Sequence, residues 1–184
     1  MKLLFSILIL GTLSASGADD ALLIARYLDY QKLPRITERK IDLEESVIQL
    51  CLDPKMYYGP HIKPGIQLYV NPTAIEARKK DSAARIYPIG SVLVKEKFAT
   101  KEASEPDIIT VMEKVSMLGG INDWKFTMIR LADRSIVRDG FKVSCVDCHS
   151  RFKESDFVST VTDSLLSEYA SKEWHVPTAT EPTR

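Results

Sequence analysis

The segment Cys145-Val146-Asp147-Cys148-His149 carries the residues best suited to chemistry in this chain. Two thiols three positions apart, followed at once by a histidine, form a C-x-x-C-H pattern. In this pattern the thiols add to the two vinyl groups of a haem and the histidine ligates the iron. The spacing therefore predicts one covalent haem c per chain, with its iron bound by His149. Such a group brings redox chemistry and the binding of small ligands.

The motif alone leaves two other interpretations open. A dithiol or disulfide redox pair needs only Cys145 and Cys148 and leaves His149 without a role. A zinc site needs four ligands, and Cys51 and His61 would complete such a set. Otherwise Cys51 is expected to be a small buried apolar residue. Haem is the interpretation that uses all three residues of the motif.

The N-terminal residues 1–18 have the pattern of a secretory signal peptide. Lys2 precedes an apolar run from Leu3 to Leu13, which is shorter than the roughly 20 residues that span a bilayer. The small residues at positions 16–18 suit signal peptidase, so we expect cleavage after Ala18 and a periplasmic protein. The alternative is an uncleaved N-terminal anchor. Export agrees with the motif, because haem c is attached outside the cytoplasm.

Residues 19–184 are expected to form a single domain with its core at about 60–160. The chain has 25 basic and 25 acidic residues, a balance that favours neither nucleic acid nor an anionic membrane as a partner. The Pro- and Thr-rich tail, about 175–184, is expected to be disordered.

The apolar pattern predicts helices on either side of a strand-rich middle. We expect a helix over 20–33 stopped by Pro34, and a helix from the Asn71-Pro72 cap to about residue 80. Alternation predicts strands over 65–71 and 91–98, and turn residues at 119–123 predict a hairpin of 108–117 with 124–131. Further helices are expected at 43–50, at the motif itself and at 157–170. This order predicts an α+β fold with an antiparallel sheet, flanking helices and the haem packed against the sheet.

Four segments together give a more specific signal. They are QLYVN followed by proline, YPIGSVLVKEKF (87–98), NDWKF (122–126), and CVDCH followed by Asp156-Phe157-Val158. Over roughly residues 60–160 this ordered set resembles the cytochrome P-460 family. The resemblance implies a mostly β fold around a c-type haem, usually in a homodimer. Hydroxylamine-oxidising members carry a lysine bonded to the porphyrin edge, whereas the related cytochromes c′-beta lack this bond and bind gases such as NO.

Carried onto this sequence, the resemblance implies roles for five residues. Cys145 and Cys148 would form the thioethers and His149 would be the proximal ligand. Lys95 corresponds to the cross-linking lysine, and Glu113 is the best match to the carboxylate that relays protons from hydroxylamine. By alternation alone, Lys95 shares a strand face with Leu93. The alternatives are a solvated lysine and a surface glutamate.

One position departs from the family pattern. The hydroxylamine oxidisers have an arginine where this chain has Ile66, although His61 and Lys63 lie just upstream. The strand region contains the methionines Met112, Met117 and Met128. We expect them to fill the core rather than ligate iron, which leaves the distal side of the haem open. The resemblance thus implies oxidation of hydroxylamine or NO, with an electron-accepting cytochrome as partner. The alternative is a gas-binding or electron-transfer cytochrome without catalysis.

Overall fold

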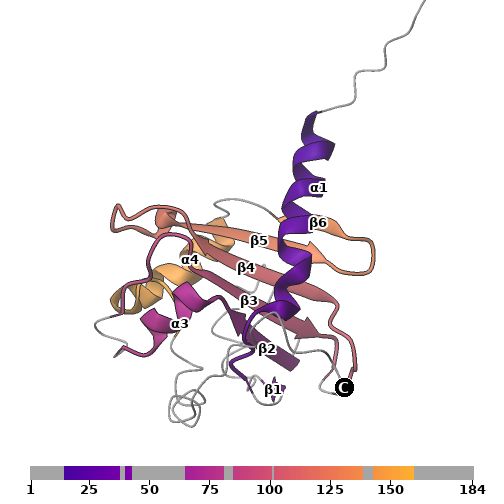
Figure 1. The fold of residues 1–184 in the computed structure, drawn as a ribbon, viewed down its shortest axis with the longest axis horizontal. Helices are drawn as coiled ribbons and strands as arrows, with labels where there is room; N and C mark the ends of the chain where they lie inside the picture. The colour runs from indigo at the N-terminus through magenta and orange to yellow at the C-terminus, as the bar shows by residue number, and fades with distance from the viewer. Residues whose placement is uncertain are drawn as a thin grey trace, which may run out of the picture.

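An antiparallel sheet of six strands forms the centre of the molecule (Figure 1). The computed structural model describes residues 15–37, 40–42, 65–80, 85–100, 102–138 and 143–159. Each strand pairs with the next along the chain, in the order β1-β2-β3-β4-β5-β6. The strands are β1 (Ile41–Asp42), β2 (Gly65–Val70), β3 (Val92–Phe98), β4 (Ile108–Lys114), β5 (Trp124–Arg130) and β6 (Ser135–Arg138).

Helices lie on both sides of this sheet (Figure 1). Helix α1 crosses one face and extends past the strands, whereas α4 lies on the other face. The helices are α1 (Ala15–Leu28), α3 (Pro72–Arg78) and α4 (Val143–His149), with short 3-10 helices η1 (Asp29–Lys32), η3 (Ile121–Asp123) and η4 (Ser150–Ser155). The predicted α+β class with an antiparallel sheet and flanking helices is therefore confirmed.

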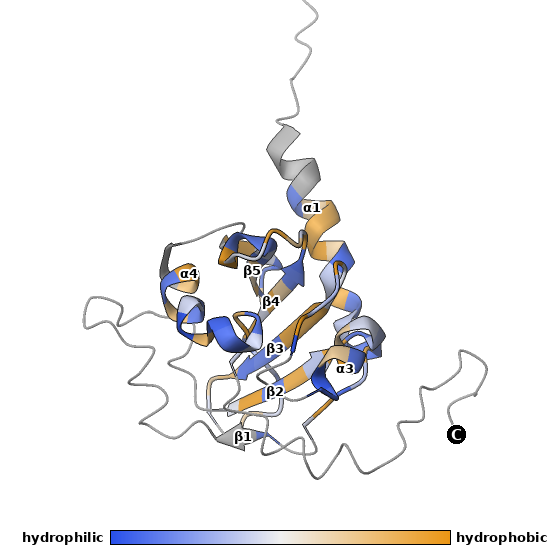
Figure 2. Ribbon diagram, turned by 90° about the vertical axis from the view of Figure 1, so that its left-hand side faces the viewer, coloured by the Kyte–Doolittle hydropathy of each residue, from blue (hydrophilic) through white to orange (hydrophobic). Residues whose placement is uncertain are grey.

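The pairing register divides the strand residues between two faces. Residues directly opposite each other on neighbouring strands point to the same side. Val94 pairs with Val111, and both pack with Tyr27 of α1; we call this side the back face. Leu93 pairs with Met112, which pairs with Phe126; we call this side the front face. Figure 2, coloured by hydropathy, shows both hydrophobic and hydrophilic stretches along β2 and β3.

Two buried carboxylates fasten the helical N-terminal segment to the back face. Tyr27 donates its hydroxyl hydrogen to Glu113, and Tyr30 donates to Glu96. Burial is the main cause that raises the pKa of Tyr30, and its hydrogen bond to Glu96 adds to the increase. Tyr30 therefore stays a neutral donor. The two hydrogen bonds fix the position of the helical segment along the back face, in addition to its apolar contacts.

We predict that Tyr30→Phe lowers the free energy of unfolding by about 1–3 kcal/mol, because it removes a donor from a buried charge. Glu96 is only 2% exposed, so water cannot replace the lost hydroxyl. Urea unfolding followed by circular dichroism measures the change. Tyr69 also donates to Glu96, at 3.3 Å, and Tyr69→Phe is the matched control, with a smaller expected loss. Equal losses in the two variants would contradict this account.

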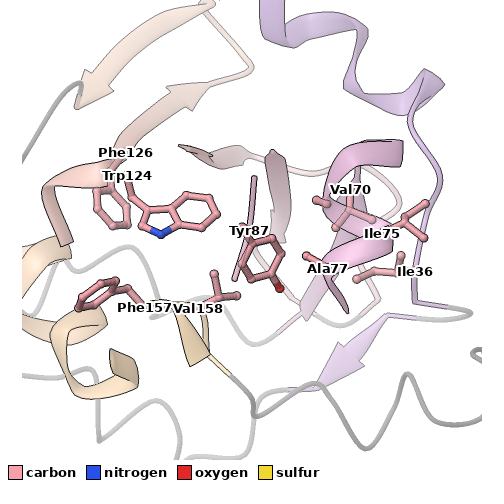
Figure 3. Close-up of a cluster of buried hydrophobic side chains, with 10 residues drawn as sticks. Ile36, Val70, Ile75, Ala77, Tyr87, Trp124, Phe126, Phe157 and Val158 are labelled. Carbon is pink, nitrogen blue, oxygen red and sulfur yellow. The ribbon is translucent and has the colours of Figure 1, made fainter. Parts of the chain in front are cut away.

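The front face carries the second apolar core, drawn in Figure 3. Trp124, Phe126 and Tyr87 meet Phe157 and Val158, which follow η4. Tyr87 and Trp124 contact edge to face, with ring centroids 5.3 Å apart. This core therefore joins the start of β5 to the chain that follows the C-x-x-C-H helix.

Helix α3 begins as the sequence predicts. The side chain of Asn71 accepts a hydrogen bond from the backbone N–H of Ala74, and Pro72 occupies the first turn. The same oxygen of Asn71 accepts from the N–H of Val92, and its amide donates to the carbonyl of Gly90. One side chain thus caps α3 and fixes the start of β3.

Most of the predicted elements are confirmed, with shifts at their ends. The helix predicted over 20–33 is α1 with η1, and the strand and hairpin predictions correspond to β2, β3, β4 and β5. The helix predicted from Phe157 is wrong at its start, because 156–157 form a turn. The predictions for 1–14, 43–50 and 160–184 lie outside the described residues. Within the described ranges, no helix has the length and apolar character needed to cross a membrane.

Candidate haem site

Helix α4 presents the C-x-x-C-H residues to the front face. Cys145 and Cys148 are half-buried thiols, and they lie one helical turn apart, where side chains share a helix side. Cys145 and Val146 pack against the front core. The short helix thus holds Cys145 against the front core, with the half-buried Cys148 one turn further along.

The ring of His149 has a fixed orientation. Its Nδ1 lies 2.7 Å from the backbone oxygen of Phe157. A carbonyl can only accept, so Nδ1 carries the hydrogen and Nε2 carries the lone pair. Phe126 and Phe152 flank the ring, with centroids 5.1 Å and 6.2 Å away. A second nitrogen held by a carbonyl is the usual arrangement of a metal-ligating histidine.

The surroundings also keep His149 neutral. Burial lowers the pKa of His149 to about 4, the hydrogen bond to Phe157 acts in the opposite direction, and the charge of Lys95 lowers it further. A neutral imidazole is the form that binds a metal.

Lys95 lies on the front face, the face of the C-x-x-C-H helix. It pairs with Leu68 on β2 and with Thr110 on β4, one row of the sheet away from Leu93. The strand alternation predicted that Lys95 and Leu93 share a face, and the register shows that this face meets α4. Lys95 is half-buried, so it is not the fully solvated lysine of the alternative interpretation.

Ile66 also belongs to the front face. It is 2% exposed and pairs with Lys97, whose side chain is 1% exposed. An apolar residue at position 66 therefore suits its buried place in the sheet. The side chain of Lys97 lies beside it, in the same row of the front face.

Glu113 is not brought to His149. It pairs with Val92 and points to the back face, where Arg26 and Tyr27 bond its carboxylate. The sheet separates the two side chains, because neighbouring residues of a strand point to opposite sides. Glu113 was expected to relay protons at the haem, and its position on the back face contradicts that expectation. The alternative, a surface glutamate, is also wrong, because Glu113 is buried.

The turn after η4 carries the carbonyl that holds His149. Asp156 and Phe157 both have left-handed backbones, with φ of 53° and 65°. Aspartate enters this region more readily than most residues, whereas a bulky residue such as phenylalanine does so rarely. A left-handed conformation costs roughly 1–2 kcal/mol per residue. The surroundings must offset this cost.

Buried charges surround that turn. Lys114 lies 2.7 Å from one carboxylate oxygen of Asp156 and 3.6 Å from Asp123. Burial would raise the pKa of Asp123, but hydrogen bonds from Ser116, Leu118 and Gly119 and the charge of Lys114 lower it to about 2. Asp123 therefore stays ionised, and Lys114 stands between two carboxylates.

Other predicted residues take no part in the described site. Cys51, His61 and Lys63 lie outside the described residues. Met112 packs against the front core and Met128 is buried, as expected of core methionines. Met117 differs from that expectation, because it is 51% exposed on the β4–β5 loop. Among the residues that the structure describes, no three His, Cys, Asp or Glu side chains gather as metal ligands.

A hollow of about 590 Å³ lies elsewhere, between η1 and the loops that join β3 to β4 and β5 to β6. None of the predicted site residues lines it. Its walls carry no thiol or imidazole, so it offers no haem ligands.

Comparison with known proteins decides between the interpretations of the motif. The family model described as Cytochrome P460 matches residues 60–160. This range holds β2 to β6, α4 and the turn that follows. The chain belongs to the cytochrome P460 family. It is accordingly a c-type haem protein of that family, and no curated protein matches it.

The described residues fit a haem of this family. The donor set consists of two thiols on one helix and an imidazole whose Nε2 carries the lone pair. Aromatic and aliphatic side chains of the front core lie beside them, as suits a large apolar ring. In this cytochrome P460 family member, Cys145, Cys148 and His149 are the residues that would hold the group.

Sequence reasoning missed the residues that orient the histidine. The acceptor is a backbone carbonyl, at Phe157, which no side-chain pattern reveals. Lys114 and Trp124 were interpreted only as strand residues. The adjacent Asp-Phe pair after the motif was a signal of the family, but it does not by itself predict a left-handed turn.

We predict that Glu113→Gln lowers the free energy of unfolding by about 1–2 kcal/mol without changing the haem spectrum. The loss reflects weaker bonding from Tyr27 and Arg26 on the back face. Thermal unfolding and the optical spectrum of the haem-loaded protein measure the two effects. A shifted Soret band in this variant would show that Glu113 reaches the haem after all.

Proposed function

We propose that this cytochrome P460 family member carries one haem c, attached covalently through Cys145 and Cys148 and ligated by His149. The observation that supports this most strongly is the hydrogen bond from Nδ1 of His149 to the Phe157 carbonyl, 2.7 Å long. It leaves Nε2 as the ligating nitrogen and fixes the plane of the ring. The expected signal peptide supports export to the periplasm, where such thioethers form.

The proposed activity is the oxidation of a small nitrogen species, hydroxylamine or NO. Haem iron supplies one-electron redox changes and a coordination position for a small ligand. Oxidation releases electrons, so the protein would need an electron-accepting partner, for which another cytochrome is suited. We also propose a homodimer, as the family resemblance implies.

Lys95 is the residue of this chain that most directly supports hydroxylamine chemistry. It lies on the front face, half-buried, and its charge acts on His149. A lysine held there would lie at the edge of the bound group, as in the hydroxylamine-oxidising members. His149 would ligate the iron, and Lys95 would be the residue that modifies the haem.

Reversible gas binding without oxidation is the second candidate. Two observations favour it. Ile66 is apolar and buried where the hydroxylamine oxidisers have an arginine, and Glu113 lies on the back face with Tyr27. Ile66 has no charged group to offer a substrate, and Glu113 points away from the front face. Neither of these two described residues would therefore act as the base for hydroxylamine.

We predict that haem stays with the denatured protein through acid-acetone extraction, because two thioether bonds survive conditions that break the bond between iron and histidine. Mass spectrometry of the protein produced with a haem-maturation system should show one added haem. The Cys145→Ala/Cys148→Ala double variant should release any haem it binds. Complete release from the unaltered protein, or zinc in place of haem, would refute the attachment.

We predict that Lys95 decides between the two candidate functions. If Lys95 is bonded to the porphyrin, Lys95→Ala converts a red-shifted spectrum to an ordinary c-type one and abolishes hydroxylamine oxidation while NO still binds. Lys125 pairs with Glu113 on the back face, and Lys125→Ala is the matched control, with no expected spectral change. Identical spectra of the unaltered protein and Lys95→Ala, with an unmodified peptide containing Lys95, would assign the protein to the gas-binding function.

A further inference from the structure

The left-handed turn at 156–157 needs an explanation beyond local sequence. Two successive non-glycine residues have positive φ there, and the second is a phenylalanine. Such conformations persist only where the surrounding structure imposes them, and they concentrate at functional positions. The contacts of this turn therefore indicate which function its conformation serves.

Three separate segments hold Asp156 by polar contacts. One carboxylate oxygen receives the ammonium of Lys114, at 2.7 Å, from the end of β4. The other accepts the backbone N–H of Tyr87, at 2.8 Å, from the turn before β3. The backbone carbonyl of Asp156 accepts the indole N–H of Trp124, at 2.9 Å, from the start of β5. Both the side chain and the backbone of this residue are thus fixed to the sheet.

Phe157 completes the arrangement. Its side chain is buried in the front core with Val158 and Trp124 (Figure 3), and its N–H donates to the carbonyl of Phe152, at 2.8 Å. With the side chain and the N–H both engaged, the remaining backbone group is the carbonyl. That carbonyl accepts Nδ1 of His149.

We propose that Asp156, with Lys114 and Trp124, is a positioning residue for the haem ligand: it locks the left-handed turn so that the Phe157 carbonyl meets Nδ1 of His149. This inference rests on the proposed function, in which His149 ligates the iron. The sheet thereby controls the basicity of the histidine, because a well-placed acceptor makes an imidazole a stronger donor to its metal. A stronger donor stabilises the ferric state and lowers the reduction potential.

The alternative is that the contacts of Asp156 only stabilise the fold. A buried ion pair is weak evidence for a specific role, and breaking it destabilises a protein in either case. The test therefore needs a measurement that reports on His149 itself. Two are suitable in the haem-loaded protein: the solvent exchange rate of the His149 Nδ1 hydrogen, seen by NMR in the ferric cyanide complex, and the reduction potential.

The experiment compares Asp156→Ala, Asp156→Asn and Asp156→Gly with the unaltered protein. In Asp156→Ala the Nδ1 hydrogen should exchange about ten-fold faster or more, as expected when a hydrogen bond is weakened, and the potential should rise. Asp156→Asn keeps an acceptor for Tyr87 and tolerates the left-handed backbone, so it should change both measurements less. Asp156→Gly removes the backbone cost, but it also removes the carboxylate contacts with Lys114 and Tyr87 and keeps only the backbone bond with Trp124. It should therefore behave like Asp156→Ala.

Glu113→Gln is the control, because it disturbs a buried polar group on the back face, away from His149. It should leave the exchange rate and the potential unchanged. Unaltered values in Asp156→Ala, equal shifts in Glu113→Gln, or values like the unaltered protein in Asp156→Gly would each overturn the inference. If the unaltered protein shows no hyperfine-shifted signals from the non-exchangeable hydrogens of an iron-bound His149, the proposed ligation itself fails, and this result is distinct from the other three.

Discussion

The buried ammonium of Lys114 is the constraint on which the front half of the molecule depends. It is 2% exposed, it stands between Asp156 and Asp123, and it lies over the ring of Trp124. A charge removed from water in this way requires compensation on every side. The three partners come from β5, the loop before it and the turn after η4, so satisfying one charge brings these segments together.

The two faces of the sheet have separate tasks. On the back face, carboxylates and tyrosines give α1 its position. On the front face, apolar side chains meet the helix of the C-x-x-C-H motif, and Lys95 lies on the same face. Because a sheet is one layer thick and its strands alternate, β2 to β5 contribute residues to both tasks. Within β3, the residue next to a front-face group in the sequence serves the back face.

Much of the fold could be predicted from the sequence because its signals are local. Alternation identified β2 and β3, and the Asn71-Pro72 pair identified the start of α3. The motif predicted the two thiols and the imidazole that would hold a haem. The 156–157 turn could not be predicted in this way, since apolar residues after Phe157 favoured a helix and the turn is imposed by Lys114 and Trp124, distant in the chain. Glu113 was misplaced for a related reason: alternation separates it from Met112 but does not say which face meets the motif.

The alternation in β3 has a consequence for changes in length rather than in residue type. Lys95 and Glu96 are adjacent and point to opposite faces, and a shift of one residue exchanges the faces of a whole strand. Deleting a single residue at the beginning of β3 would thus present a carboxylate to the front face and bury an ammonium against Tyr30, which inverts the sign of the electric field at the candidate site. A deletion in the loop at 102–106 leaves that register intact. The sign of the charge that faces the site is therefore encoded in the spacing of β3 as much as in its composition.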